Sequence, residues 1–184
     1  GNTVVNNDVT ISAGTIVGAN DLTINGGDLT GDGDIAMTGG EVLLVGTGSF
    51  GGATNWGFSS LTFGGGGVAT TTKVGINSIS ASDTLTITAA HVLNASDSTW
   101  NVSGGGTPFV INGVFNEGTS TFQYTSTSSA NITPTTYYNL DLAAAGTGSP
   151  TYDMLLGSCV IGNNFTVGDG TNPTTVTANA SDPS

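Results

Sequence analysis

The chain has 184 residues, of which 13 are acidic and one is basic, giving a formal net charge of -12. Nucleic-acid binding and polybasic membrane contact both depend on Lys and Arg, so this composition excludes them. With 36% hydrophobic residues, 8% charged residues and 30 glycines, the chain has the length for one domain and too little charge for an acidic disordered chain.

A strand pattern repeats near the N-terminus at an interval of about 13 residues. Residues 7–11 (NDVTI) return as residues 20–24 (NDLTI) and, more loosely, as residues 33–37 (GDIAM). Val9 and Ile11 are two positions apart and therefore share one face of a strand, which is the period of a half-buried sheet. The glycines and Asn-Asp pairs between these runs supply turns. A repeat of this kind indicates a stacked architecture.

The same pattern continues to the C-terminal region with a longer step. Read from Val9, it returns at Ile35, Leu61, Leu85, Phe109, Leu140 and Phe165. A second series interleaves with this one at the same step. We therefore predict a parallel β-helix, or β-solenoid, of about seven coils with roughly 25 residues per coil. Val9, Ile35, Leu61, Leu85 and Phe109 are predicted to lie above one another on one buried sheet.

The repeated unit also resembles a known family. Units of the form x-Leu/Val-Thr-Ile-x-Gly-Gly, rich in Thr, Asn, Gly and Ser, resemble the parallel β-helix repeats of large microbial cell-surface proteins and adhesins. The resemblance covers nearly the whole chain and implies an extracellular setting, but it brings no catalytic residues with it. The alternative fold is an antiparallel β-sandwich, because turn signals at roughly every 8 to 12 residues also suit antiparallel meanders.

The later segments predict corners and one loop. Residues 64–67 (GGGG) and 104–106 (GGG) are flexible turns, and residues 143–150 form another turn region. Residues 126–134 are predicted to form a loop that leaves the rod, which accounts for the longer step from Phe109 to Leu140. No helix is expected. Residues 1–184 are predicted to form a single solenoid domain without a capping repeat, which indicates either a segment of a longer chain or ends covered by other copies.

Few residues suggest site chemistry, and we predict no enzyme. A lyase needs a base with a cationic helper, for which only His91 and Lys73 are available, and His91 has no neighbouring Asp or Cys in the sequence. A hydrolase could work with paired carboxylates alone, but most carboxylates are scattered one per turn. Asp28, Asp32 and Asp34 cluster at turns and are the candidate ligands for calcium, a cation that prefers carboxylate and carbonyl oxygens. Turn chemistry explains the same aspartates without a metal. No other cofactor is predicted.

Modification and stacking residues complete the candidates. Cys159 is the only cysteine and is expected to be a small buried residue, with a reactive or intermolecular thiol as the alternative. The aromatic candidates for sugar stacking are Trp56, Phe58, Trp100, Tyr137 and Tyr138. Five Asn-x-Ser/Thr sequons are candidate glycosylation sites, with Asn131 favoured because of the predicted loop, followed by Asn94, Asn101, Asn164 and Asn179.

These observations favour an extracellular or cell-surface structural or adhesive protein. The expected form is a stiff acidic β-rod that assembles with itself into a filament, sheath or surface layer, with surface glycans as a further partner. One alternative is a β-helix that binds or cleaves carbohydrate. A second is an ice-binding solenoid, suggested by two groups of threonines, residues 70–72 and Thr84, Thr86 and Thr88. No membrane span is predicted, because no apolar run approaches the roughly 18 residues that a spanning helix needs.

Overall fold

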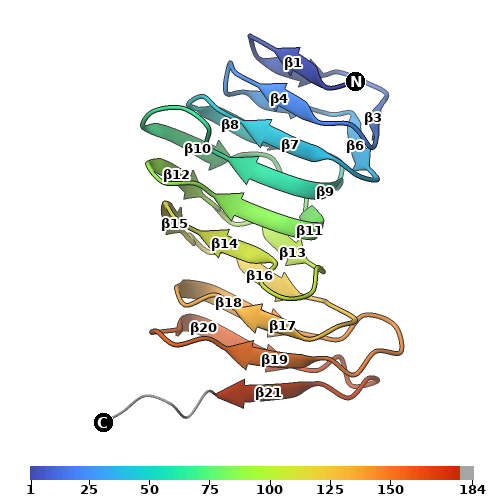
Figure 1. Cartoon of the computed structure of the whole chain (residues 1–184), viewed down its shortest axis with the longest axis vertical. Helices are drawn as coiled ribbons and strands as arrows, with labels where there is room; N and C mark the ends of the chain where they lie inside the picture. The colour runs from blue at the N-terminus through green and yellow to red at the C-terminus, as the bar shows by residue number, and fades with distance from the viewer. Residues whose placement is uncertain (179–184) are drawn as a thin grey trace.

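The computed structural model describes residues 1–178, and within them the chain is a stack of parallel β-strands (Figure 1). Every strand pair in this range is parallel and no helix is present. The chain makes about 8 turns of a β-solenoid with about 22 residues per turn. The predicted solenoid of seven coils is therefore confirmed in class and close in number. The antiparallel sandwich, the alternative fold, is wrong.

Each turn has three sides, because short strands with alternate residues pointing inward are separated by corners that contain Gly, Ser, Thr, Asn or Asp. The first side begins with β1 and continues to β14 through strand pairing and then, through a bridge between Gly106 and Ala130, to the sheet of β17, β19 and β21. Its strands are β1 (Thr3–Val5), β4 (Leu22–Ile24), β7 (Glu41–Leu44), β14 (Phe109–Ile111), β17 (Ala130–Ile132), β19 (Thr151–Met154) and β21 (Thr175–Ala178).

The second and third sides complete the coil. The second side is one six-stranded sheet composed of β2 (Val9–Ile11), β5 (Leu29–Gly31), β8 (Gly48–Gly52), β10 (Ala69–Lys73), β12 (His91–Asn94) and β15 (Val114–Asn116). The third side contains β3 (Thr15–Gly18), β6 (Asp34–Met37), β13 (Thr99–Val102) and β16 (Thr121–Tyr124).

Four long strands cross a corner without a break. In β9 (Trp56–Phe63) and β11 (Ile79–Ile87) the early residues lie on the third side and the late residues on the first, so these strands join the two sides into one sheet. The long strands β18 (Thr136–Leu142) and β20 (Val160–Val167) pair with each other, and the later part of β18 pairs with β16. The pairing register shifts at such a corner, as it does between Ala81 and Thr84 of β11, so the strand bends there.

Aromatic side chains fill the interior of the middle coils. Phe50 contacts Trp56, Phe63 and Trp100 with ring centroids 5.5, 5.3 and 6.1 Å apart. Farther along, Phe109 and Phe122 stack at 4.4 Å. These side chains are all 0 to 1% exposed. Burial of such large rings contributes to stability together with the buried aliphatic side chains.

The predicted column of buried residues is correct only in part. Leu61, Leu85 and Phe109 do lie above one another, because Leu61 pairs with Leu85 and Leu85 with Phe109. Val9 instead pairs with Leu29 on the second side, and Ile35 pairs with Trp56 on the third.

The physical reason is the length of the first coils. Thr3 pairs with Leu22 and Leu22 with Val42, so each early coil contains only about 20 residues. The interval of the N-terminal repeat is roughly two thirds of such a coil, and it carries each repeat to a different side. That interval therefore spans two sides and the turns between them, and a full coil needs a third side.

The predicted loop over residues 126–134 is also wrong, because these residues form part of the rod. Ser126, Ala130 and Ile132 are 1 to 2% exposed, and β17 lies within this segment. Ser and Thr are common in loops, but here small polar residues occupy a tight corner while Ala130 and Ile132 point inward. The other predicted turns are confirmed, since residues 64–67, 104–106 and 143–150 all lie between strands.

Candidate assembly interface

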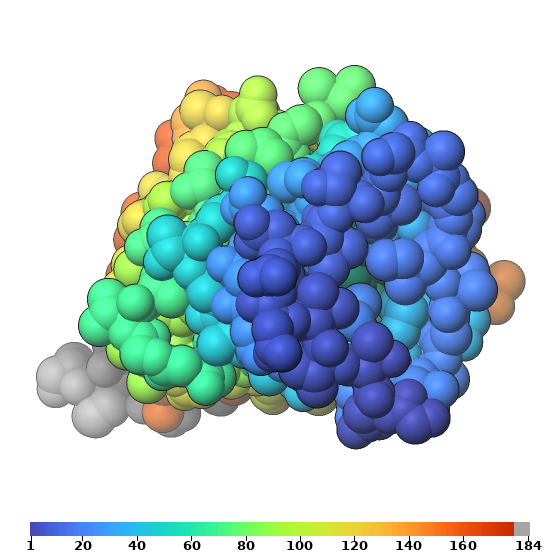
Figure 2. All heavy atoms as spheres, turned by 90° about the horizontal axis from the view of Figure 1, so that it is seen from above, coloured from blue at the N-terminus to red at the C-terminus, as the bar shows by residue number. Residues whose placement is uncertain are grey.

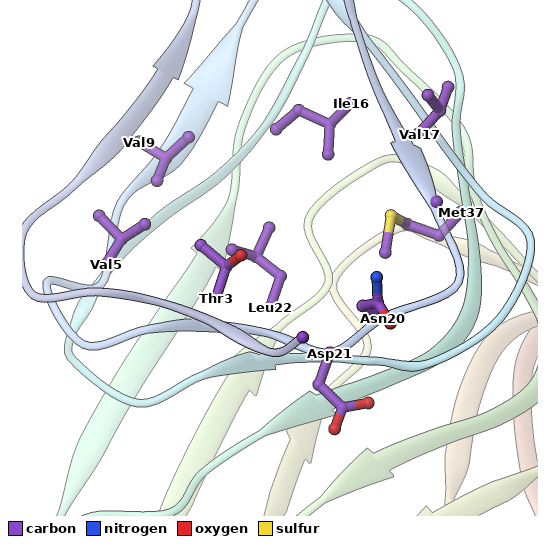
Figure 3. Close-up of a pocket in the computed structure, with 11 residues that line it drawn as sticks. Thr3, Val5, Val9, Ile16, Val17, Asn20, Asp21, Leu22 and Met37 are labelled. Carbon is purple, nitrogen blue, oxygen red and sulfur yellow. The ribbon is translucent and has the colours of Figure 1, made fainter.

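The first coils surround an open hollow at one end of the rod. Figure 2 views this end along the stack, and Figure 3 shows Val5, Val9, Ile16 and Met37 pointing toward the middle of the coil. The hollow has a volume of about 320 Å³ and is lined mainly by apolar side chains. Val9 and Ile16 are half-buried, although the residues paired with them in the next coil, Leu29 and Ile35, are fully buried. This end therefore presents core side chains to the surface.

The backbone at the same end is also only half paired. β1 pairs with β4, β2 with β5 and β3 with β6, and none of these three has a second partner in residues 1–178. Their outer edges present N–H and C=O groups on three sides of one coil. A strand edge of this kind is a template for another strand.

The opposite end has the same character. β20 pairs only with β18, and β21 only with β19, within the part of the chain that the structure describes. Val160, Phe165 and Val167 on β20 are 46 to 48% exposed. Both end coils of the described rod therefore combine free strand edges with exposed apolar side chains.

The sides of the rod differ from its ends, because their outward side chains bond to one another from coil to coil. On the second side, Asn94 Nδ2 donates to Thr72 Oγ1 at 3.0 Å and Asn116 Nδ2 donates to Asn94 Oδ1 at 2.8 Å. On the third side, Asn139 Nδ2 donates to Thr121 Oγ1 at 3.1 Å. Such ladders satisfy the amide groups internally, so the sides offer fewer free donors and acceptors to a partner than their composition indicates.

Charge is distributed unevenly between surface and interior. No acidic side chain in residues 1–178 is buried, whereas the one basic residue, Lys73, is only 2% exposed. The charged side chains on the solvent-facing surface of this part of the chain are therefore all acidic. Like charges on neighbouring rods repel until salt screens them.

The three aspartates predicted to bind calcium lie along one short stretch of the second coil. Asp28 accepts a hydrogen bond from the Ser49 N–H at 2.6 Å, Asp34 begins β6, and Asp32 is exposed in the turn between β5 and β6. No group of three or more His, Cys, Asp or Glu side chains in residues 1–178 is placed to hold a metal ion. Calcium binding here stays a prediction.

The sequons lie on strands. Asn94 and Asn101 point outward from β12 and β13, Asn131 lies on β17, and Asn164 is exposed on β20. The favoured Asn131 is not in a loop, and its Nδ2 donates to Thr107 Oγ1 at 2.9 Å. A glycan on Nδ2 would replace one of its two hydrogens, so only one N–H would be left to make that bond. Asn179 lies outside the described residues.

The aromatic candidates for sugar stacking are mostly interior. Trp56, Phe58, Trp100 and Tyr137 are 0 to 2% exposed, and only Tyr138 is half-exposed. The buried four cannot serve as a stacking platform. The threonine pattern that suggested ice binding is likewise interrupted, because the outward column of the first side that contains Thr62 and Thr86 also contains Leu43 and Val110.

Burial sets the protonation of the interior polar groups. His91 Nε2 lies 2.9 Å from Thr71 Oγ1, its Nδ1 has no partner, and burial lowers the pKa of the ring. Burial raises the pKa of Tyr124 to about 12, although the hydroxyls of Tyr124 and Tyr137 lie 3.0 Å apart. Cys159 is half-buried against the core and burial raises the pKa of its thiol, which disfavours the reactive thiolate.

Two features are not evident from the sequence. The first is the end hollow, which cannot be predicted without the correct coil length. The repeat alone indicates only that Val9 and Ile16 point toward the interior of the solenoid. The second feature is the contact between Lys73 and Asn77, of which the sequence shows only that the one basic residue is followed four positions later by an amide. Without the fold, nothing indicates that both side chains are buried.

Comparison with known proteins identifies no family, so the class of this protein is defined by its fold. No protein-family model, curated protein or solved structure matches this chain. Across residues 1–178 the structure contains no helix that is long and apolar enough to cross a membrane. The chain is a parallel β-solenoid whose described end coils have free strand edges and whose second and third sides carry side-chain hydrogen bonds from coil to coil.

Proposed function

We propose that this protein is an extracellular or cell-surface structural or adhesive element, an acidic β-rod that assembles end to end. The observation that carries the proposal is the end coil. Val5, Val9 and Ile16 line an apolar hollow whose rim consists of the free edges of β1, β2 and β3. A surface with both features is covered most completely by another three-sided coil of the same cross-section, whether from the same polypeptide or from a second copy.

End-to-end contact gives an open filament. The two ends are different surfaces, so the contact is heterologous and continues indefinitely unless its rotation closes a ring. The strand edges would pair at the sheet spacing of about 4.8 Å, and the apolar side chains of both ends would leave water together. The self-bonded ladders on the sides favour the ends as the contact surface.

The near absence of sites for trypsin-like proteases supports a setting outside the cell. Lys73 is the only residue after which a trypsin-like protease cuts, and it is buried.

The net charge of -12 opposes assembly at low ionic strength. Screening reduces the reach of that repulsion from about 30 Å at 0.01 M salt to about 8 Å at 0.15 M. Assembly is therefore expected to strengthen with salt, and calcium is expected to act in the same direction.

The test measures the molar mass of the purified chain by light scattering at about 0.15 M salt. The wild-type chain should form species larger than the monomer. Val5→Lys places a charge in the end hollow and should prevent this. Val114→Lys is the matched control, because Val114 is 49% exposed on the second side and away from the ends. A monodisperse wild-type monomer, or equal behaviour of the two variants, would contradict the proposal.

A further inference from the structure

The only basic side chain of the protein is held inside the rod against an amide. Lys73 ends β10, and its inward side chain is level with Phe50 of the neighbouring strand. Its Nζ donates to Val74 O at 2.6 Å, to Gly75 O at 3.3 Å and to Asn77 Oδ1 at 2.7 Å. The ammonium group has three N–H donors, and these three acceptors match them in number.

Asn77 is held in one orientation. Its side chain is part of a residue only 1% exposed, and Oδ1 accepts a second hydrogen bond from the Gly52 N–H at 2.8 Å. Lys73 Nζ and the Gly52 N–H are both donors, so the oxygen and not the nitrogen of the amide must face them. The Nδ2 group then points elsewhere, and it has no hydrogen-bond partner.

Two groups that are unfavourable to bury, the Lys73 ammonium and the unpartnered Asn77 Nδ2, therefore lie together at this corner. A buried ammonium is expensive even when it is hydrogen-bonded, and a buried N–H donor without an acceptor forfeits its hydration. Burial lowers the pKa of Lys73 to about 8, although the negative charge of Asp97 opposes the shift. Near pH 8 about half of the molecules then hold a neutral amine, which has a free electron pair.

We propose that Lys73 and Asn77 react with each other to form an intramolecular isopeptide bond. The neutral Nζ attacks Asn77 Cγ, and the new C–N bond forms as the negative charge moves to Oδ1. The Gly52 N–H already donates to that oxygen and stabilises the charge. The bond from Cγ to Nδ2 then breaks, Nδ2 takes a proton from Nζ, and one molecule of ammonia leaves. No oxidant, metal or further reactant is needed.

The product no longer contains either of these unfavourable buried groups. The ammonium becomes a neutral amide whose single N–H can donate to Val74 O, and the orphaned Nδ2 group departs as ammonia. The new bond closes the turn between β10 and β11, where the chain passes from the second side of the coil to the third. The reaction also converts the only trypsin site in the sequence into an amide that trypsin does not recognise. This inference does not depend on assembly.

The experiment is the intact mass of the purified full chain. The wild-type chain should weigh about 17 Da less than its sequence mass, the mass of one ammonia. Peptide mapping should place the loss between residues 73 and 77. Lys73→Met and Asn77→Ala remove one reactant each and should show the full sequence mass. Loss of ammonia by succinimide formation at Asn25-Gly26 or Asn112-Gly113 would map to those positions instead and would count against the proposal.

Trypsin digestion in urea gives an independent readout that does not depend on folding during the assay. The crosslinked wild-type chain should stay intact, whereas Asn77→Ala, which keeps a free Lys73, should be cut into two fragments. A wild-type chain of full sequence mass that is cut by trypsin in urea, and that stays unchanged after incubation at about pH 9, would overturn the proposal.

Discussion

Substitution of Leu61 by Asp tests the stacked core at its centre. Leu61 lies on β9, is 0% exposed, and stacks between Val42 and Leu85. Removing its side chain as far as Cβ leaves a cavity that neighbours on both sides cannot fill, because each is fixed by its own coil. Leu61→Ala should therefore lower the free energy of unfolding by about 2–5 kcal/mol.

Leu61→Asp should cost more than Leu61→Ala, because it adds a buried carboxyl without a partner. A charged carboxylate at this position is so unfavourable that its pKa rises, and the folded state binds the proton first. The folded state is then stabilised as the pH falls. The gap between the Asp and Ala variants should narrow by up to about 1.4 kcal/mol per pH unit on acidification toward the unfolded pKa of about 3.9.

Urea unfolding followed by circular dichroism measures the effect. For a slope of about 2 kcal/mol per molar urea, a loss of about 4 kcal/mol lowers the midpoint by roughly 2 M. Val114→Asp is the control, because it makes a similar change at an outward position that is 49% exposed. If Leu61→Asp unfolds at the same urea concentration as Val114→Asp, Leu61 does not lie in a packed column and the stacking is refuted.

Three further predictions concern the backbone and the buried polar groups. Gly31→Ala should destabilise the fold by more than about 1 kcal/mol, because Gly31 has φ +128° and a Cβ there would collide with the backbone oxygen of Ile11 in the preceding coil, whereas Gly67→Ala, in open space, should be neutral in the same urea assay. His91 is kept neutral by burial, so wild-type stability should fall as the pH drops below about 6.5, and thermal melts of His91→Leu should show less of this fall. Tyr124 and Tyr152, whose pKa values are raised to about 12, should stay protonated at about pH 11 in the native protein and ionise near pH 10 in urea, as ultraviolet absorbance of tyrosinate will show.

The parallel solenoid is predictable because the sequence contains a regular repeat of short strand patterns. Leu61, Leu85 and Phe109 follow one another at equal steps, each begins a short apolar-Thr or apolar-Val run, and the structure stacks them in that order. In this region one step of the pattern equals one coil. The column can therefore be identified without any knowledge of the corners.

The length of the early coils is not predictable from the same pattern. Val9, Leu22 and Ile35 are equivalent in sequence, yet they lie on the second, first and third sides. Each strand and its turn form one unit, and a regular sequence does not state how many units close a coil. That number is set by corner geometry and interior packing, which are long-range properties.

The candidate interface is likewise only partly predictable from the sequence. A stack of coils is foreseeable from the repeat. The residues that line the hollow are not, because Val5, Val9 and Ile16 meet only after the coil closes. The Lys73–Asn77 contact depends likewise on the inward direction of two side chains separated by a turn.

The claim that the end coils pair with one another is tested most directly by electron cryomicroscopy of the purified chain at about 0.15 M salt. We expect filaments in which the strand spacing of about 4.8 Å continues without a break across each subunit junction. Single rods with both end coils exposed to solvent, or filaments joined through their sides, would contradict it.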